Sequence, residues 1–110
     1  MSYLGEFEQL ILFSVLQLGD EAYGVAIREN IDQRTGRVVS SGAIYTALGR
    51  MERRGFVTSR VGEATAGKAG RPRKYYEMER AGARALHDTY ATIQAISGGL
   101  MPQLADLAER

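Results

Sequence analysis

The spacing of apolar residues changes at Gly55, and this change restricts the folds that the chain can adopt. Before Gly55, apolar residues recur at steps of three and four, which is typical of helices that bury one face. After it, residues 56–61 and 73–78 alternate and are rich in β-branched and aromatic side chains, which is typical of strands. The helical period returns from about residue 80. The predicted order is therefore three helices, a β-hairpin and a further helix, in a chain of 110 residues that fits one small domain.

The three N-terminal helices have recognisable ends. The first stops at Gly19, and its broad apolar stripe comprises Leu4, Phe7, Leu10, Ile11, Val15 and Leu18. The second covers Tyr23 to Thr35 and ends at Gly36. The third lies between Ser40, whose side chain is suited to cap a helix N-terminus, and Gly55, which favours the left-handed conformation that terminates helices.

The third helix has two different faces. At 100° per residue, one side is apolar and is predicted to be buried: Ile44, Ala47, Leu48 and Met51. The opposite side has no acidic residue and comprises Ser41, Gly42, Tyr45, Thr46, Gly49, Arg50 and Arg53. Gly49 costs a helix about 1 kcal/mol relative to alanine, but leaves room for a phosphate backbone to approach. Tyr45 fits two roles equally well, a partly buried packing residue or an outward contact.

The predicted hairpin tip nearly matches a phosphate-binding loop. Residues 62–69 read GEATAGKA, against the pattern GxxxxGK[ST]. Ala69 replaces the hydroxyl that would bind a metal ion, the following Gly-Arg-Pro disfavours a helix, and the preceding strand belongs to a hairpin. Because all three requirements fail, we predict instead a basic hairpin tip with Lys68, Arg71, Arg73 and Lys74.

Positive charge is concentrated in the middle of the chain, although the net charge is only +1. Residues 1–33 contain six acidic residues and one arginine, and residues 75–110 contain five acidic residues and three arginines. Residues 34–74 contain ten basic and two acidic residues. This distribution fits an electrostatic footprint for a polyanion, and charge alone fits a solvated surface equally well.

The C-terminal region contains a heptad-like seam. Two series of residues are spaced by seven, and the seam comprises Leu86, Tyr90, Ile93, Ser97, Leu100, Leu104 and Leu107. We predict that it packs in the core or between subunits, with Leu86, Tyr90, Ile93, Leu100 and Leu104 as the dimer contacts. Gly98, Gly99 and Pro102 predict a break in this helix near residues 98–102.

The composition argues against several function classes. The chain has no cysteine and a single histidine, His87, without a nearby nucleophile pattern, so we expect neither an enzyme nor a metal or other cofactor. No apolar run reaches the roughly 20 residues of a membrane span, and the N-terminus does not resemble a signal peptide. We therefore expect a cytoplasmic protein that does not bind membranes.

The order of elements is that of a winged helix-turn-helix, a mainly α fold with a small β-hairpin. In this fold the third helix enters the major groove of DNA, and the hairpin, called the wing, reaches the backbone or the minor groove. We expect residues 1–79 to form this domain and residues 80–110 to form a dimerisation helix of the same compact unit. The alternative is a winged-helix module that binds another protein, which would expose apolar anchors; Tyr45 is the only candidate.

Four stretches resemble the PadR-like transcriptional regulators. They are LGEFEQLILFSVL (4–16), AYGVAIREN (22–30), SSGAIYTALGRMERRGFV (40–57) and GRPRKYYEMERAGARAL (70–86). The resemblance covers about the first 90 residues, and the combination in this order is specific. Two positions depart from the family pattern: Glu79 and Arg80 stand where a capping threonine is common, and Thr46 stands where a proline often follows the tyrosine.

The resemblance implies a homodimeric repressor that binds double-stranded operator DNA. Its last helix would pack on the partner's first helix. The third-helix residues that map to DNA recognition are Ser41, Tyr45, Thr46 and Arg50, with Lys68, Arg71 and Arg73 in the wing. Regulators of this family often respond to small aromatic or drug-like effectors near the dimer interface; Phe7, Tyr90 and Met101 fit either such a pocket or plain core.

Overall fold

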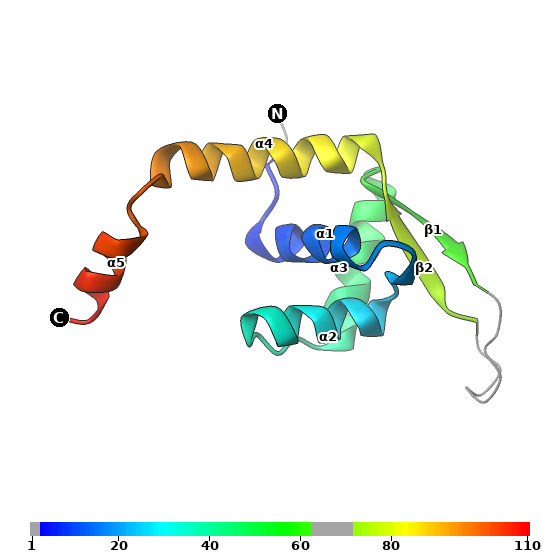
Figure 1. Ribbon diagram of the computed structural model, residues 1–110. Coiled ribbons are helices and arrows are strands. Elements are labelled where there is room, and N and C mark those ends of the chain that lie inside the picture. Colours follow the sequence, from blue (N-terminus) through cyan, green and yellow to red (C-terminus); the bar gives the residue numbers. More distant parts are fainter. Residues whose placement is uncertain (1–2, 63–71) are drawn as a thin grey trace.

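The computed structural model describes residues 3–62 and 72–110. Their elements are α1 (Glu6–Leu18), a short 3-10 turn (Gly19–Glu21), α2 (Gly24–Thr35), α3 (Ser41–Arg53), β1 (Val57–Val61), β2 (Lys74–Met78), α4 (Arg80–Ser97) and α5 (Met101–Ala108). Figure 1 shows α1, α2 and α3 gathered into one body, with the hairpin on one side and α4 crossing above α1. The predicted winged helix-turn-helix is therefore confirmed.

The core lies where the first three helices meet the hairpin and the first turns of α4. The predicted apolar face of α3 is fully buried, because Ile44, Leu48 and Met51 have no exposed surface and Ala47 has 1%. Leu12 is also buried, although the sequence analysis did not place it on the stripe of α1. The N-terminus is tied to α4 where the Leu4 backbone N–H donates to Thr89 Oγ1, a buried hydrogen bond of 3.1 Å.

The helix ends follow local rules. Ser40 Oγ accepts a hydrogen bond from the backbone N–H of Ala43 at 3.1 Å, so the predicted cap of α3 is confirmed. Gly36 and Gly55 follow α2 and α3 with φ of 74° and 79°, the left-handed values expected of helix-terminating glycines. Glu79 precedes α4 without a capping side-chain hydrogen bond.

The wing is an antiparallel pair in which Val57 pairs with Met78 and Arg60 pairs with Tyr75. A third segment joins its edge, because Tyr23 forms an isolated antiparallel bridge with Tyr75. The Tyr76 N–H donates to the Ala22 carbonyl at 2.8 Å. The segment that leads into α2 is thus hydrogen-bonded directly to the returning strand of the wing.

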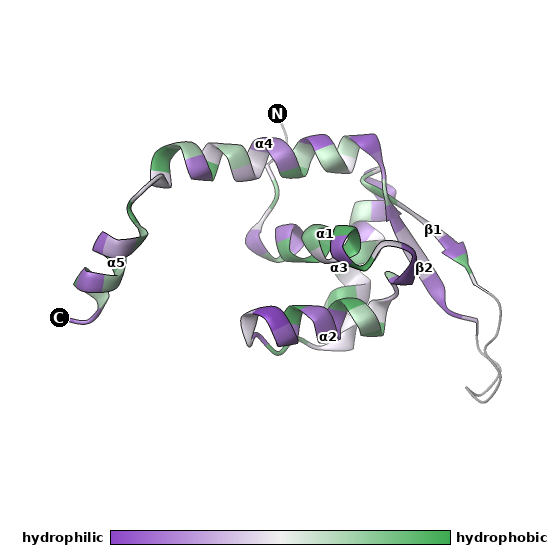
Figure 2. Ribbon diagram, viewed as in Figure 1, coloured by the Kyte–Doolittle hydropathy of each residue, from purple (hydrophilic) through white to green (hydrophobic). Residues whose placement is uncertain are grey.

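The C-terminal helices extend away from the body. α4 ends at Ser97, and the predicted break is confirmed by the turn at Gly98 and Gly99 before α5. The radius of gyration is 16.1 Å, compared with about 13 Å for a compact protein of this length. Hydrophobic segments nevertheless recur along α4 to its far end (Figure 2). Within the two described ranges, no helix combines the length and apolar character needed to cross a membrane.

Candidate nucleic-acid interface

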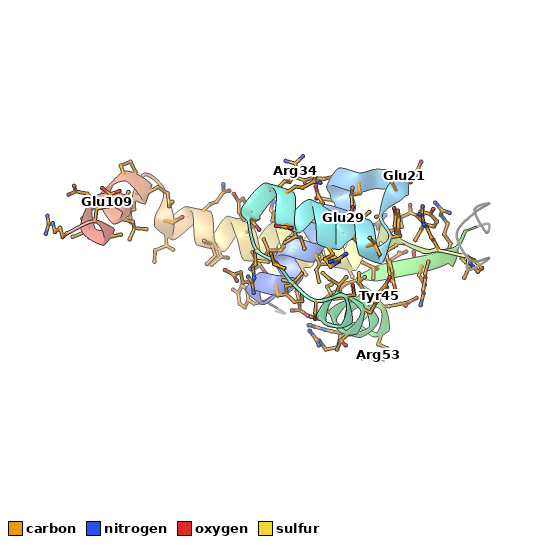
Figure 3. The ribbon with its side chains drawn as sticks, turned by 90° about the horizontal axis from the view of Figure 1, so that it is seen from below. Glu21, Glu29, Arg34, Tyr45, Arg53 and Glu109 are labelled. Atoms are coloured by element: carbon orange, nitrogen blue, oxygen red, sulfur yellow. The ribbon has the colours of Figure 1, made fainter. Side chains whose placement is uncertain are left out.

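The outward face of α3 is exposed as predicted. Ser41, Gly42, Tyr45, Thr46, Arg50 and Arg53 are all exposed, and Gly49 is half-buried. Figure 3 shows Tyr45 on the side of α3 that faces α2, whereas Arg53 lies at the outer edge of the helix. The arginines therefore project from a helix whose opposite side is fixed in the core.

Tyr45 packs within the protein and is also partly exposed, so its role as an outward contact stays a prediction. Its side chain is 46% exposed, but its ring also packs against the start of α2. A Cβ built on Gly24 would lie 2.5 Å from Tyr45 Cε1, Cζ and Oη, closer than carbon atoms pack. A side chain at position 24 would therefore displace the Tyr45 ring from the start of α2.

The one acidic residue of α3 faces the wing. Glu52 Oε2 accepts a hydrogen bond from Ser59 Oγ of β1 at 2.5 Å, and Glu52 Oε1 pairs with Lys74 Nζ of β2 at 3.4 Å. The pKa of Glu52 is lowered, chiefly by the hydrogen bond from Ser59; burial opposes this effect, and the hydrogen bond and charge of Lys74 add to the lowering. Burial raises the pKa of the neighbouring Tyr76 phenol. Glu52 thus links α3 to both strands of the wing and leaves the outward face of α3 without an acid.

Two arginines at the wing base lie on aromatic rings. The Arg73 guanidinium carbon is 4.3 Å from the centroid of the Tyr23 ring, and that of Arg60 is 4.6 Å from the Tyr75 ring. The two tyrosine rings meet edge to face, with centroids 5.6 Å apart. Tyr23 was missed in the sequence analysis because only the pairing of α2 with β2 brings it to the wing.

A hollow of about 560 Å³ separates the wing from the helices. Its wall includes Tyr23 and Glu29 of the α2 segment, Tyr45 of α3, and Arg73 and Lys74 of the wing. The structure therefore brings Tyr45, Arg73 and Lys74 of the predicted set together. The other two predicted wing residues, Lys68 and Arg71, lie outside the described residues.

The predicted dimer residues fall into two groups. Leu86 is 3% exposed and belongs to the core of its own protomer. The other four, Tyr90, Ile93, Leu100 and Leu104, are 44% exposed or more. The neighbouring apolar side chains of Ile96, Met101 and Leu107 are also exposed. The seam is therefore an apolar surface from Tyr90 onward.

A second hollow, of about 460 Å³, lies between α1, α2 and α4. Leu10, Phe13, Ile31 and Tyr90 supply apolar wall, and the Phe13 and Tyr90 rings meet edge to face at 5.3 Å. Its polar wall is ordered by Asn30, which donates to Ser14 Oγ at 2.8 Å and to Gln17 Oε1 at 2.9 Å and accepts from Arg34 Nε at 3.1 Å. Of the three residues considered for a pocket, Tyr90 lines this one, and Met101 is 71% exposed on α5.

Solved structures share the fold over most of the chain. A PadR-like transcriptional regulator from Bacillus cereus is 26% identical, with 89% of this chain and 90% of that chain covered at a TM-score of 0.69. A transcriptional regulator from Clostridium thermocellum is also 26% identical, with 82% of each chain covered and a TM-score of 0.69. A PadR-like transcription factor from Bacteroides fragilis is 26% identical, with 83% and 82% covered and a TM-score of 0.66.

No curated protein sequence matches the chain. The sequence profile of the transcriptional regulator PadR-like family, however, matches residues 12–88, from within α1 to the middle of α4. This match covers well over half of the chain and includes the helices and wing described above. The chain therefore belongs to the PadR-like family and is a transcriptional regulator with a winged-helix DNA-binding fold, not an enzyme.

Proposed function

We propose that the chain is a sequence-specific repressor that binds double-stranded operator DNA as a homodimer in the cytoplasm and is released by a small aromatic or drug-like effector. The proposed DNA contacts of α3 are Ser41, Tyr45, Thr46, Arg50 and Arg53. Those of the wing are Lys68 and Arg71, because Lys74 is paired with Glu52 and Arg73 lies over the Tyr23 ring.

The observation that carries this proposal is the set of basic residues without an internal partner. In residues 34–74, most described bases are engaged by the protein itself: Arg34 with Asn30, Arg37 with Glu6, Arg54 with Glu8, Lys74 with Glu52, and Arg60 and Arg73 with tyrosine rings. Among contacts between described residues, Arg50 and Arg53 are the bases of this segment with no ion pair, side-chain hydrogen bond or ring contact. Both lie on the outward face of α3, the helix that enters the major groove in this fold.

DNA binding is tested by fluorescence anisotropy near 0.15 M salt, using labelled DNA from upstream of the chain's own gene and excess unrelated duplex. We expect binding that survives the competitor and is lost in the Arg50→Ala, Arg53→Ala double variant. Arg84→Ala is the control for removal of an exposed arginine, because Arg84 is exposed on α4 and does not belong to α3. Unchanged affinity of the folded double variant, or no binding of the wild type to genomic fragments at low salt, would contradict the proposal.

Homodimer formation is supported by the apolar surface of α4 and α5. Monomeric proteins rarely expose a continuous apolar surface of this kind, and a partner subunit would cover it. We expect Ile93→Asp with Leu104→Asp to convert a dimer into a monomer in light scattering after size exclusion. Thr92→Asp, which adds a negative charge at an exposed position outside the seam, should leave the dimer intact. A monomeric wild type would contradict the assembly.

The effector proposal rests on the hollow between α1, α2 and α4. Its volume of about 460 Å³ is within the range of small-molecule sites, and its wall combines aromatic rings with an ordered polar network. Saturation-transfer NMR with a panel of small aromatic compounds tests it. We expect binding that Phe13→Ala abolishes and that lowers operator affinity; failure of every compound to alter operator binding would argue against release by such molecules. Repression itself is tested with a reporter under the operator, whose expression should rise when the regulator is deleted.

A further inference from the structure

The base of the wing is held by a chain of stacked side chains from three segments. Arg60 of β1 lies over the Tyr75 ring of β2, Tyr75 meets the Tyr23 ring of the α2 segment, and Arg73 lies over Tyr23. We propose that this stack, here called the wing lock, positions the wing relative to α3, so that Tyr23, Tyr75 and Arg73 act on DNA binding through the placement of the wing. The link to DNA rests on the proposed function above.

Backbone contacts place the wing lock at the junction of the two DNA-binding elements. The bridge between Tyr23 and Tyr75 and the hydrogen bond from the Tyr76 N–H to the Ala22 carbonyl join the α2 segment to β2. Tyr23 is followed in the chain by Gly24, and the Tyr45 ring of α3 packs on Gly24. A displacement of Tyr23 would therefore be transmitted to both the wing and the recognition helix.

The Tyr75 ring also covers the point where the chain leaves β1. A Cβ built on Gly62 would lie 2.5 Å from Tyr75 Cε2, so the ring is in close contact with the Gly62 backbone. The Gly62 N–H donates to the Arg73 carbonyl at 2.7 Å, which closes the hairpin at this level. The wing lock thus lies beside Gly62 and Arg73, the hydrogen-bonded pair of residues at the end of the described hairpin.

The arginines of the lock are attracted to the rings by electrostatics. A guanidinium within about 6 Å of a ring centroid is stabilised by the negative face of the ring, and the effect increases when the site is partly desolvated. Arg73, Tyr23 and Tyr75 are all half-buried, and Arg60 also donates from Nη2 to the Asp20 carbonyl at 3.4 Å. These contacts assign Arg73 a positioning role, in place of the direct wing contact predicted from the sequence.

The test separates the tyrosine ring from its hydroxyl. Tyr23→Phe and Tyr75→Phe keep the stack and remove a potential hydrogen bond to DNA, whereas Tyr23→Leu and Tyr75→Leu remove the stack. We expect each Leu variant to weaken operator binding about tenfold and each Phe variant to retain wild-type affinity. Tyr3→Leu, at an exposed tyrosine outside the lock, is the control. Equal losses in the Phe and Leu variants would overturn the proposal in favour of direct contact.

NMR tests whether the stacked side chains of the wing lock are formed in the absence of DNA. The Arg73 Hε proton should resonate upfield because of the Tyr23 ring current, and the Gly62 amide should be protected from hydrogen exchange. Both signals should be lost in Tyr23→Leu and Tyr75→Leu and retained in the Phe variants. An Arg73 Hε chemical shift without upfield displacement, together with unprotected exchange of the Gly62 amide, in the free wild type would overturn the proposal.

The Arg73 Hε signal in the complex with DNA distinguishes positioning of the wing from direct contact with DNA. If Arg73 positions the wing, its upfield Hε signal persists when operator is added; loss of this signal on binding would show that Arg73 leaves Tyr23 for DNA and would overturn the proposal. A wild type that shows the free-state signals but binds no operator would overturn the proposed function, while the lock itself would stand.

Discussion

Replacing Gly49 with alanine should change stability and DNA affinity in opposite directions. Gly49 is the ninth residue of the 13-residue helix α3, where glycine costs about 0.8–1.0 kcal/mol relative to alanine. The added Cβ would meet Arg53 Nη1 at 3.5 Å, an ordinary contact with the end of a flexible side chain. The free energy of unfolding should therefore rise by about 1 kcal/mol, which raises Tm by about 4–8 °C in a domain near this size.

The same methyl group stands on the surface that we propose faces DNA. Adding a group to a close-packed contact typically costs about 1–3 kcal/mol, which is about 5- to 150-fold in Kd. Urea denaturation and operator anisotropy, measured on the same preparation, give both quantities. Thr92→Ala, in the exposed middle of α4, is the control, because it should raise helix stability without altering DNA affinity. Unchanged affinity of the stabilised Gly49→Ala variant would refute the close approach, and reduced stability would refute the free space at Gly49.

Two further predictions concern the placement of α3. Ser40→Ala removes the side-chain oxygen that accepts from the Ala43 N–H and should lower the free energy of unfolding by about 1 kcal/mol in urea titrations, whereas Ser40→Asp should restore it. Glu52→Gln tests the carboxylate bound to Ser59 and Lys74. Because folding lowers the Glu52 pKa, its stabilisation is present above the unfolded pKa of about 4.3 and is lost as the pH falls through the lower folded value. The stability difference between wild type and Glu52→Gln should therefore shrink from pH 6 to pH 3; a difference that is constant over this range, or one shared by Glu77→Gln on the outer face of β2, would contradict this assignment.

Local sequence signals predicted the elements that depend on neighbours along the chain. Ser40 and Gly55 bound α3, and the period of 3.6 residues placed Ile44 and Leu48 in the core, because a helix brings residues three and four apart to the same side. The break after Ser97 was equally predictable, since two consecutive glycines disfavour a continuous helix.

Contacts between distant segments were not predictable from such signals. The partners of Lys74 and Arg73 are Glu52 and Tyr23, which are 22 and 50 residues away, and nothing in the local pattern specifies them. The position of Leu86 has a related cause. The heptad spacing places it on the same stripe as Tyr90, but α4 crosses the body only along its first turns, so Leu86 is buried there and the later residues are exposed.

The number of basic residues that are held by ion pairs or ring contacts within the protein also determines how strongly DNA affinity should depend on salt concentration. If every one of the ten basic residues in residues 34–74 neutralised a phosphate, a dimer would show a slope of log affinity against log salt of about −18. Arg50 and Arg53 alone would give about −3.6, and Lys68 and Arg71 together with them would give about −7. Because ion pairs and ring contacts hold most of the other bases, the slope should lie between these last two values. A slope near −18 would mean that DNA draws Arg37, Lys74 and Arg73 away from their partners, and the contacts that hold the wing against α3 would then have to break whenever the regulator binds.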